Sequence, residues 1–383
     1  TREKKGENSV SRRIYLDFNA STPIAPEAIE ALRPFLAEHY GNPSSLHWAG
    51  TPAKDAVENA RGQVSGILGC DPSEVVFTSG GSEANNHAIK GIFFANQDRG
   101  DHIVTTAVEH PATIEPCRFL ERSLGARVTV LPVDGFGMVD PDDVRKAITP
   151  RTILITVMHA NNEVGTVEPI PEIAKIARGV GIPFHTDAAQ TVGKIPTGVD
   201  DLGVDLLSVA GHKVHAPKGI GALYIREGTR IEPFIHGAGH EGGRRAGTEN
   251  VLLAVALGAA CAAAREWAGI PRVKALRDQF WEGLKDIFGR RVTLNGHPSE
   301  RLPNTLNVNF IGRIGSEVLA SLPGVAASTG SACHAGSVTL SPVLAAMGVP
   351  LGEGMGAVRF SLGRTTTREE LEEVLRLLRE SLC

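Results

Sequence analysis

Short apolar runs along the chain alternate with segments of helical spacing. Bounded by turn residues, these runs predict strands at residues 74–78, 102–108, 128–133, 152–159, 182–186, 206–210 and 221–225. Between two of them, residues 170–178 repeat apolar positions at the three- and four-residue intervals of an amphipathic helix. Strands separated by helices are typical of an α/β fold with a largely parallel sheet, so we expect these strands to form one large sheet.

A change of pattern in the last third of the chain indicates a second, smaller domain. A long Ala-rich helix and another at residues 273–287 lead into residues 305–310, whose alternating pattern predicts a strand. Thr367 and Glu370 have the spacing of a capping box and open an amphipathic helix that runs to about Leu382. The sequence therefore predicts a flexible leader at residues 1–13, a large domain at residues 14–262 and a small α+β domain at residues 263–383. We also expect the first residues of the large domain to pack on the small one.

Charge and composition narrow the classes of partner. The 383 residues are 42% hydrophobic with a formal net charge of -4, which is typical of a soluble globular protein and argues against nucleic acid as a partner. The longest apolar stretch, residues 251–264, is shorter than the roughly 20 residues of a membrane span. Residues 1–13 are polar and lack the apolar core of a secretory signal, so we expect a cytoplasmic protein. The five cysteines form no C-x-x-C pair, which argues against a disulfide framework or a metal site.

The most specific local signal is a lysine that follows a predicted strand. In Ser208-Val-Ala-Gly-His-Lys213 an apolar strand ends in a small-residue turn. A lysine held there in a dry cleft loses part of its preference for the charged form and can form a Schiff base with an aldehyde cofactor. Taken alone, the pattern also fits a solvated surface lysine.

Polar residues follow other predicted strands and converge on the same edge of the sheet. Asp187 could keep a pyridine nitrogen protonated or cap a helix, and Gln190 could donate to a phenolic oxygen or face solvent. The run Thr78-Ser-Gly-Gly-Ser-Glu-Ala84 suits an anion at a helix N-terminus, or a tight turn with a cap. His110 and Asn161 also end strands, where an imidazole and an amide suit a cofactor ring and a substrate carboxylate. Each is ambiguous alone, but their convergence is hard to explain by packing.

These residues resemble the cysteine desulfurases and selenocysteine lyases of the class V aminotransferase group. The resemblance covers nearly the whole chain, through Tyr15-Leu-Asp-Phe-Asn-Ala20, Gly41-Asn-Pro-Ser-Ser45 and Arg359-Phe-Ser-Leu-Gly-Arg364. It implies the fold type I of pyridoxal-phosphate (PLP) enzymes, with a mainly parallel seven-stranded sheet. It also implies that Lys213 carries the cofactor, His110 stacks on its ring, Asp187 pairs with the ring nitrogen and Gln190 with its hydroxyl. The implied phosphate ligands are Gly81, Ser82, His212 and, across a homodimer interface, Thr248; the implied carboxylate ligands are Asn161, which also contacts the cofactor, and Arg364.

The resemblance further implies a nucleophilic cysteine. Cys333, in Ser328-Thr-Gly-Ser-Ala-Cys-His334, matches the family nucleophile that takes sulfur from L-cysteine as a persulfide and passes it to a thiol or an acceptor protein. Ala210 stands where desulfurases usually have a serine, and His334 where they usually have a small hydroxyl residue; selenocysteine lyases resemble this chain at both positions. A selenocysteine lyase, a class V aminotransferase and a non-catalytic protein of the same fold remain as alternatives.

Overall fold

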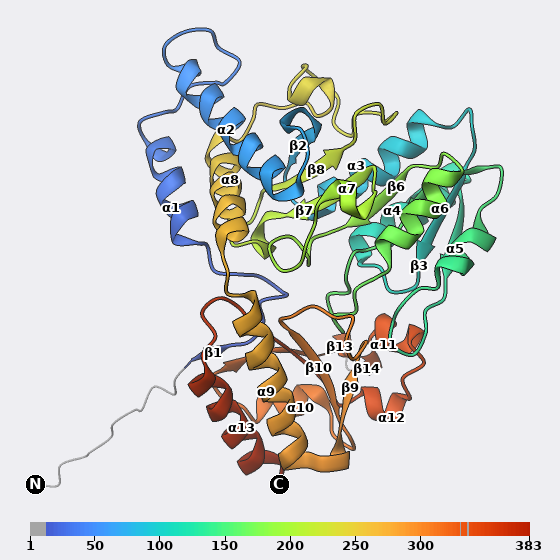
Figure 1. Ribbon diagram of the computed structural model, residues 1–383, viewed down its shortest axis with the longest axis vertical. Coiled ribbons are helices and arrows are strands. Elements are labelled where there is room, and N and C mark those ends of the chain that lie inside the picture. The colour runs from blue at the N-terminus through green and yellow to red at the C-terminus, as the bar shows by residue number, and fades with distance from the viewer. Residues whose placement is uncertain (1–12, 330, 335–336) are drawn as a thin grey trace, which may run out of the picture.

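A seven-stranded sheet forms the centre of the larger part of the molecule (Figure 1). The computed structural model describes residues 13–329, 331–334 and 337–383. Strand β8 pairs antiparallel with both of its neighbours, and the other pairs are parallel, which confirms the predicted α/β fold. In the order β2-β8-β7-β6-β5-β3-β4 the strands are Val75–Thr78, Gly221–Ile225, Leu206–Ala210, Phe184–Asp187, Thr152–Thr156, His102–Thr106 and Arg127–Leu131.

Helices cover both faces of this sheet, because its strands alternate apolar residues between two cores. Val75 and Phe77 face one core, whereas Val76 between them faces the other. The first core is completed by α1 (Pro26–Leu32), α2 (Gly50–Leu68), α5 (Pro141–Ala147), α6 (Ile170–Gly179), α7 (Val199–Leu202) and α8 (Val251–Glu266). The second is completed by α3 (Gly81–Ala95) and α4 (Pro111–Leu124).

A second layered unit is built around its own hydrophobic core and lies at the lower end of Figure 1. Its antiparallel sheet, in the order β12-β15-β10-β9, comprises Ser328–Thr329, Ala357–Ser361, Thr305–Phe310 and Val292–Asn295. The helices that pack on it are α9 (Ile270–Phe288), α10 (Gly315–Ala320) and α13 (Arg368–Leu382). The capping box that opens α13 is present, since Thr367 accepts from the Glu370 backbone and Glu370 accepts from that of Thr367.

The first described residues join this smaller unit. Strand β1 (Ile14–Tyr15) pairs in parallel with β11 (Val325–Ala326), and Ile14 and Leu16 are buried in the smaller core. The predicted domain boundary after residue 262 lies inside α8, which continues to Glu266, so the exact division of the chain stays a prediction. The predicted leader, apart from Arg13, lies outside the described residues.

The remaining elements lie between the two units or at their edges. A two-stranded hairpin is formed by β13 (Ser331–His334) and β14 (Ser337–Leu340), and the short helices α11 (Pro342–Ala346) and α12 (Leu351–Gly354) follow it. In the described part of the chain no single helix has the length and apolar character needed to cross a membrane. One pair of consecutive helices, Val251–Glu266 and Ile270–Arg291, meets these criteria together by length and composition alone, with a bend of 75° between the two helices.

Candidate functional site

A cavity of about 580 Å³ lies at the carboxyl ends of the parallel strands, where open α/β sheets bind their ligands. Its wall brings together polar residues that are far apart in the sequence. Seven of the sequence-predicted site residues line it: Gly81, Ser82, His110, Asp187, Gln190, His212 and Lys213. We call Ser82, His110, Asp187 and Lys213, each of which follows a different strand of the large sheet, the strand-end rim.

Lys213 ends a short 3-10 helix, Gly211–Lys213, that follows β7 directly. Its Nζ donates a hydrogen bond to the backbone oxygen of Asn19. Burial, helped by the nearby Arg359 guanidinium and opposed by Asp187 and Asp17, lowers the pKa of Lys213 to about 8. The site therefore maintains a substantial fraction of neutral, nucleophilic amine near neutral pH.

Asp187 is the last residue of β6 and is 6% exposed. Its two oxygens are oriented separately, because Oδ2 accepts from Asn85 Nδ2 at 2.7 Å and Oδ1 accepts from the Ala189 backbone at 2.9 Å. These hydrogen bonds hold a carboxylate in one orientation in the cavity wall. Asn85 was not predicted as a site residue, although it lies one turn into α3 and lines the same cavity.

The opposite part of the cavity wall is suited to an anion. Helix α3 begins at Gly81 after Gly80, which has no side chain to cap the helix, so the first backbone N–H groups are left for a ligand. A Cβ added to Gly81 would lie 3.1 Å from the Ala210 Cβ, so Ala210 packs directly on this turn without adding a hydroxyl. His212 also lines the cavity, and burial, with Lys213 and Lys218 as smaller causes, lowers its pKa to about 4.

His110 caps the N-terminus of α4 from the edge of the cavity. Its Nδ1 accepts from the Ala112 backbone at 3.0 Å, which leaves the proton of the neutral ring on Nε2. Desolvation lowers the pKa of His110, and Lys213 adds to this while Asp187 opposes it. The ring is therefore neutral at physiological pH and presents a single donor.

A second group of contacts surrounds Asn19, which is 1% exposed. Its backbone oxygen accepts from Gln190 Nε2 at 3.0 Å, and its Oδ1 accepts from Asn304 Nδ2 at 3.0 Å. Lys194 Nζ donates to Gln190 Oε1 at 3.0 Å and lies 3.5 Å from Asn19 Oδ1. We call Asn19, Gln190, Lys194 and Asn304 the Asn19 cluster; of these, the sequence analysis identified only Gln190.

The structure places two neighbouring asparagines differently. Asn161, for which the resemblance implies contacts to cofactor and substrate, is fully buried and is not among the residues that line the cavity, so its role stays a prediction. Its Nδ2 donates to the Val108 backbone at 3.0 Å, and its Oδ1 accepts from the Glu163 and Val164 backbones at 2.8 and 2.9 Å. Asn162 lines the cavity instead. The Asn161 side chain therefore stabilises the turn after β5, and Asn162 in the same turn lies in the cavity wall.

Two other predicted site residues, Arg364 and Thr248, are not among the residues that line this cavity. Arg364 lines a separate cavity of about 30 Å³ that also touches Lys213, with its guanidinium carbon 4.9 Å from the centre of the Trp267 ring. Thr248 is exposed on the loop before α8. The Cys333 and His334 side chains lie outside the described part of the structure; their backbone belongs to β13, where Cys333 pairs with Val338.

The other cysteines have the environments of packing residues or of a chain end. Burial raises the pKa of the thiols of Cys70, Cys117 and Cys261 to about 12, which suppresses the reactive thiolate. Cys383 is exposed. Among the described residues, no group of three or more His, Cys, Asp or Glu side chains could hold a metal ion.

Comparison with known proteins agrees with this architecture. Residues 14–374 match the family model of class-V aminotransferases. The chain is 50% identical over 375 residues to a cysteine desulfurase IscS of Dictyoglomus turgidum, covering 96% of this chain and 94% of that one. A solved NifS-like protein superimposes with a TM-score of 0.90 at 36% identity, covering 96% of this chain and 98% of that one. A structure of SspA in complex with cysteine gives a TM-score of 0.82 at 39% identity, covering 91% and 98%. The chain belongs to the class-V aminotransferase family and, within it, to the cysteine desulfurases.

Proposed function

We propose that the protein is a PLP-dependent cysteine desulfurase. In the overall reaction, L-cysteine and the Cys333 thiol give L-alanine and a Cys333 persulfide: the carbon–sulfur bond of the substrate breaks, and a sulfur–sulfur bond forms on the enzyme. The observation that carries the proposal is the placement of the desolvated Lys213 amine in one cavity with a buried carboxylate and an uncapped helix N-terminus.

The residues of the cavity fit the chemical parts of PLP. Asp187 supplies a buried anion for a protonated pyridine nitrogen, and the N-terminus of α3 with Ser82 supplies donors for a phosphate. Lys213, in the same cavity wall, supplies an amine for the aldehyde. The volume of about 580 Å³ is in the range of cofactor pockets. When bound, PLP withdraws electrons from the α-carbon of an amino acid substrate.

The chain's own residues supply the proton transfers and the orientation. The lowered pKa of Lys213 allows its Nζ to take a proton near neutral pH and to return it. His110 presents an Nε2–H donor from the N-terminus of α4, and Asp187 maintains a negative charge in a fixed direction through its bonds to Asn85 and Ala189. Arg364 suits a substrate carboxylate, provided that its guanidinium leaves Trp267 when substrate enters.

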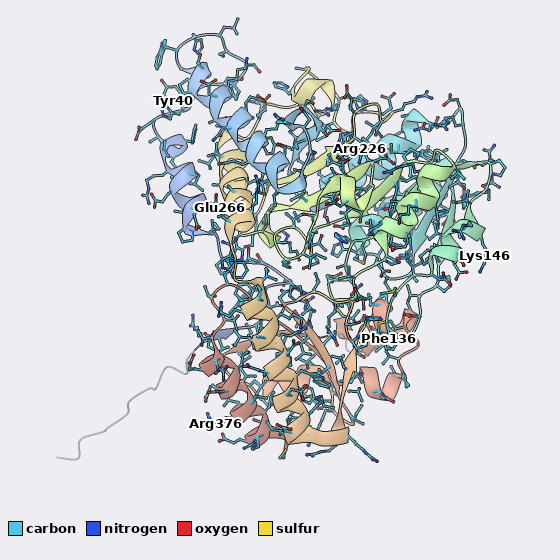
Figure 2. All side chains as sticks on the ribbon, viewed as in Figure 1. Tyr40, Phe136, Lys146, Arg226, Glu266 and Arg376 are labelled. Atoms are coloured by element: carbon cyan, nitrogen blue, oxygen red, sulfur yellow. The ribbon has the colours of Figure 1, made fainter. Side chains whose placement is uncertain are left out.

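A homodimer belongs to this proposal. The loop between α1 and α2 exposes several large apolar residues, Leu36, Tyr40, Leu46 and Trp48, and Leu46 is 97% exposed. Tyr40 lies at the outer edge of the molecule, at the end opposite the smaller unit (Figure 2). A second copy that covers this loop would remove its apolar surface from water, and the family resemblance implies that Thr248 of one chain then reaches the phosphate of the other site. A cytoplasmic location and a sulfur-accepting thiol or protein stay predictions.

The test is alanine release from L-cysteine by the PLP-loaded enzyme with a reductant present. We expect Cys333→Ala to retain the bound cofactor and its visible absorption, and to lose at least about 100-fold in turnover because the sulfur has no acceptor. Cys383→Ala, the same change at an exposed cysteine, is the matched control and should turn over normally.

Each other outcome points to a different protein. Full turnover by Cys333→Ala would contradict the role of this cysteine. Turnover of L-selenocysteine alone would make the protein a selenocysteine lyase, and release of glutamate or pyruvate would make it an aminotransferase. A colourless protein that binds no PLP would contradict the proposal as a whole.

A further inference from the structure

A second enclosed lysine, Lys194, lies beside Lys213 and has no part in the chemistry described above. The residue as a whole is partly buried, but protein surrounds its amine end, and this burial, with Lys213 and Arg359 nearby, lowers the pKa of Lys194 to about 7. Within the described residues Lys194 forms no ion pair, and the titratable or charged groups that act with it are Lys213, Arg359 and His215, all of them bases. An enclosed lysine is normally paired with a carboxylate, so this arrangement requires another explanation.

The hydrogen bonds of Lys194 determine the orientation of one side chain in the cavity wall. Its Nζ donates to Gln190 Oε1 at 3.0 Å, while Gln190 Nε2 donates to the Asn19 backbone oxygen at 3.0 Å. A backbone oxygen can only accept, which places the amide nitrogen on the side of Asn19, and Lys194 can donate to the amide oxygen in both its charged and its neutral form. Together the two partners select one of the two amide orientations, with the nitrogen of Gln190 on the side of Asn19.

The contacts of the Gln190 amide with Asn19 and Lys194 use only one of its two N–H hydrogens. Gln190 lines the large cavity, and its nitrogen already uses one hydrogen on Asn19. The amide therefore presents a donor, not an acceptor, to whatever occupies the cavity. If the amide turned over, its oxygen would lie opposite the Asn19 oxygen, and two acceptors would face each other.

We propose that Lys194 is a positioning residue that acts through Gln190, holding the amide so that its N–H group donates to the phenolic oxygen of the cofactor. This inference rests on the proposed PLP-dependent function and assigns a task to a residue outside the cavity wall. A donor at the phenolic oxygen stabilises its anionic form, so the nearby Schiff-base nitrogen on Lys213 releases its proton more readily. Loss of the donor has the opposite effect.

The test is a pH titration of the visible absorption of the PLP-loaded enzyme without substrate. In Lys194→Met the amide loses its oxygen partner, and we expect the pH midpoint of the absorption change to move upward by about one pH unit. Lys194→Gln retains a donor for Gln190 Oε1 and should move the midpoint less; it also serves as the second variant if Lys194→Met does not fold. Lys175→Met, an exposed lysine on α6, is the matched control and should leave the midpoint where it is.

A double variant separates an effect through Gln190 from a direct effect of charge. Gln190→Ala alone should raise the midpoint about as much as Lys194→Met, and combining the two should add little. If Lys194→Met leaves the midpoint unchanged, or if its effect persists in full in the Gln190→Ala background, the inference is wrong. These outcomes differ from a failure of the proposed function, in which the native protein would show no PLP absorption at all.

Discussion

The strand-end rim and the Asn19 cluster surround the same lysine but are assembled in opposite ways. Each residue of the rim is placed by the turn that follows its own strand, as Asp187 is at the end of β6 and His110 at the start of α4. The Asn19 cluster joins the first described segment to residues near positions 190 and 304, and no single local element holds it together. The rim therefore places chemical groups one at a time, whereas the cluster depends on the two units of the molecule being correctly packed.

The largest expected effect lies in the rim. Asp187→Asn retains an acceptor for Asn85 but loses the negative charge, and we expect turnover of cysteine to fall on the order of 10²–10³-fold because the electrostatic support of the reacting groups is lost. The measurement is alanine release at saturating cysteine, together with unfolding in urea. Because the change is local, stability should remain nearly native.

Asp205→Asn provides the matched control at the other end of the same pair of strands. Asp205 Oδ2 accepts from the Phe184 backbone at 2.9 Å, so this carboxylate supports the start of β6 and β7 rather than the cavity. Asp205→Asn should therefore release alanine at nearly the native rate. Equal losses of turnover in the two variants would mean that the rim has no special part in the chemistry.

The different construction of the two regions also explains what the sequence could predict. Lys213, Asp187 and His110 lie at or just after the carboxyl ends of apolar strands, and the rule that ligands bind at these ends brings them together without coordinates. Lys194 does not follow a predicted strand, and a lysine in a turn is normally solvated, so the sequence did not indicate a role for it. Its enclosure depends on residues distant in the sequence, since its Nζ lies 3.5 Å from Oδ1 of Asn19, which is 175 positions away.

The sequence also could not show which of Asn161 and Asn162 lines the cavity. Both lie in the turn after β5, and as asparagines they suit a ligand equally well. Which one turns inward depends on the backbone of residues 161–166, where the Asn161 side chain accepts from two backbone N–H groups. Neither apolar periodicity nor residue type contains that information.

The next largest effect should appear in the Asn19 cluster, and there it should be structural. Asn19→Ala removes a partner of Asn304 Nδ2 and a partner of Thr305 Oγ1, at 3.0 and 2.8 Å. Each of these buried groups loses one hydrogen bond and retains another, Asn304 Nδ2 to the Leu362 backbone and Thr305 Oγ1 to Asn304 Oδ1. The free energy of unfolding should therefore fall by about 2 kcal/mol. Urea unfolding of the cofactor-free protein measures this loss, and alanine release should fall by only about 10-fold.

Asn309→Ala is the control for a buried asparagine elsewhere in the smaller unit. Asn309 Nδ2 donates to Asn295 Oδ1 at 3.0 Å within the smaller sheet. Its replacement should cost a similar amount of stability and leave the PLP absorption native. If Asn19→Ala retained full stability, the cluster could not be what holds the two units in register around the site.

The smallest expected effect is a change in how stability depends on pH. The pKa of Lys194 is about 7 in the folded protein, against about 10.4 for an unfolded lysine. Between these values the unfolded chain binds a proton at this residue and the folded chain does not, so raising the pH favours folding. Relative to Lys194→Met, the cofactor-free native protein should therefore gain stability from pH 7 upward, by at most about 1.4 kcal/mol per pH unit. Urea unfolding at about pH 7 and about pH 8 measures the difference, and Lys175→Met should show none. A constant difference across this range would mean that Lys194 is protonated in the folded protein, and that the cluster stabilises an ammonium group without a carboxylate.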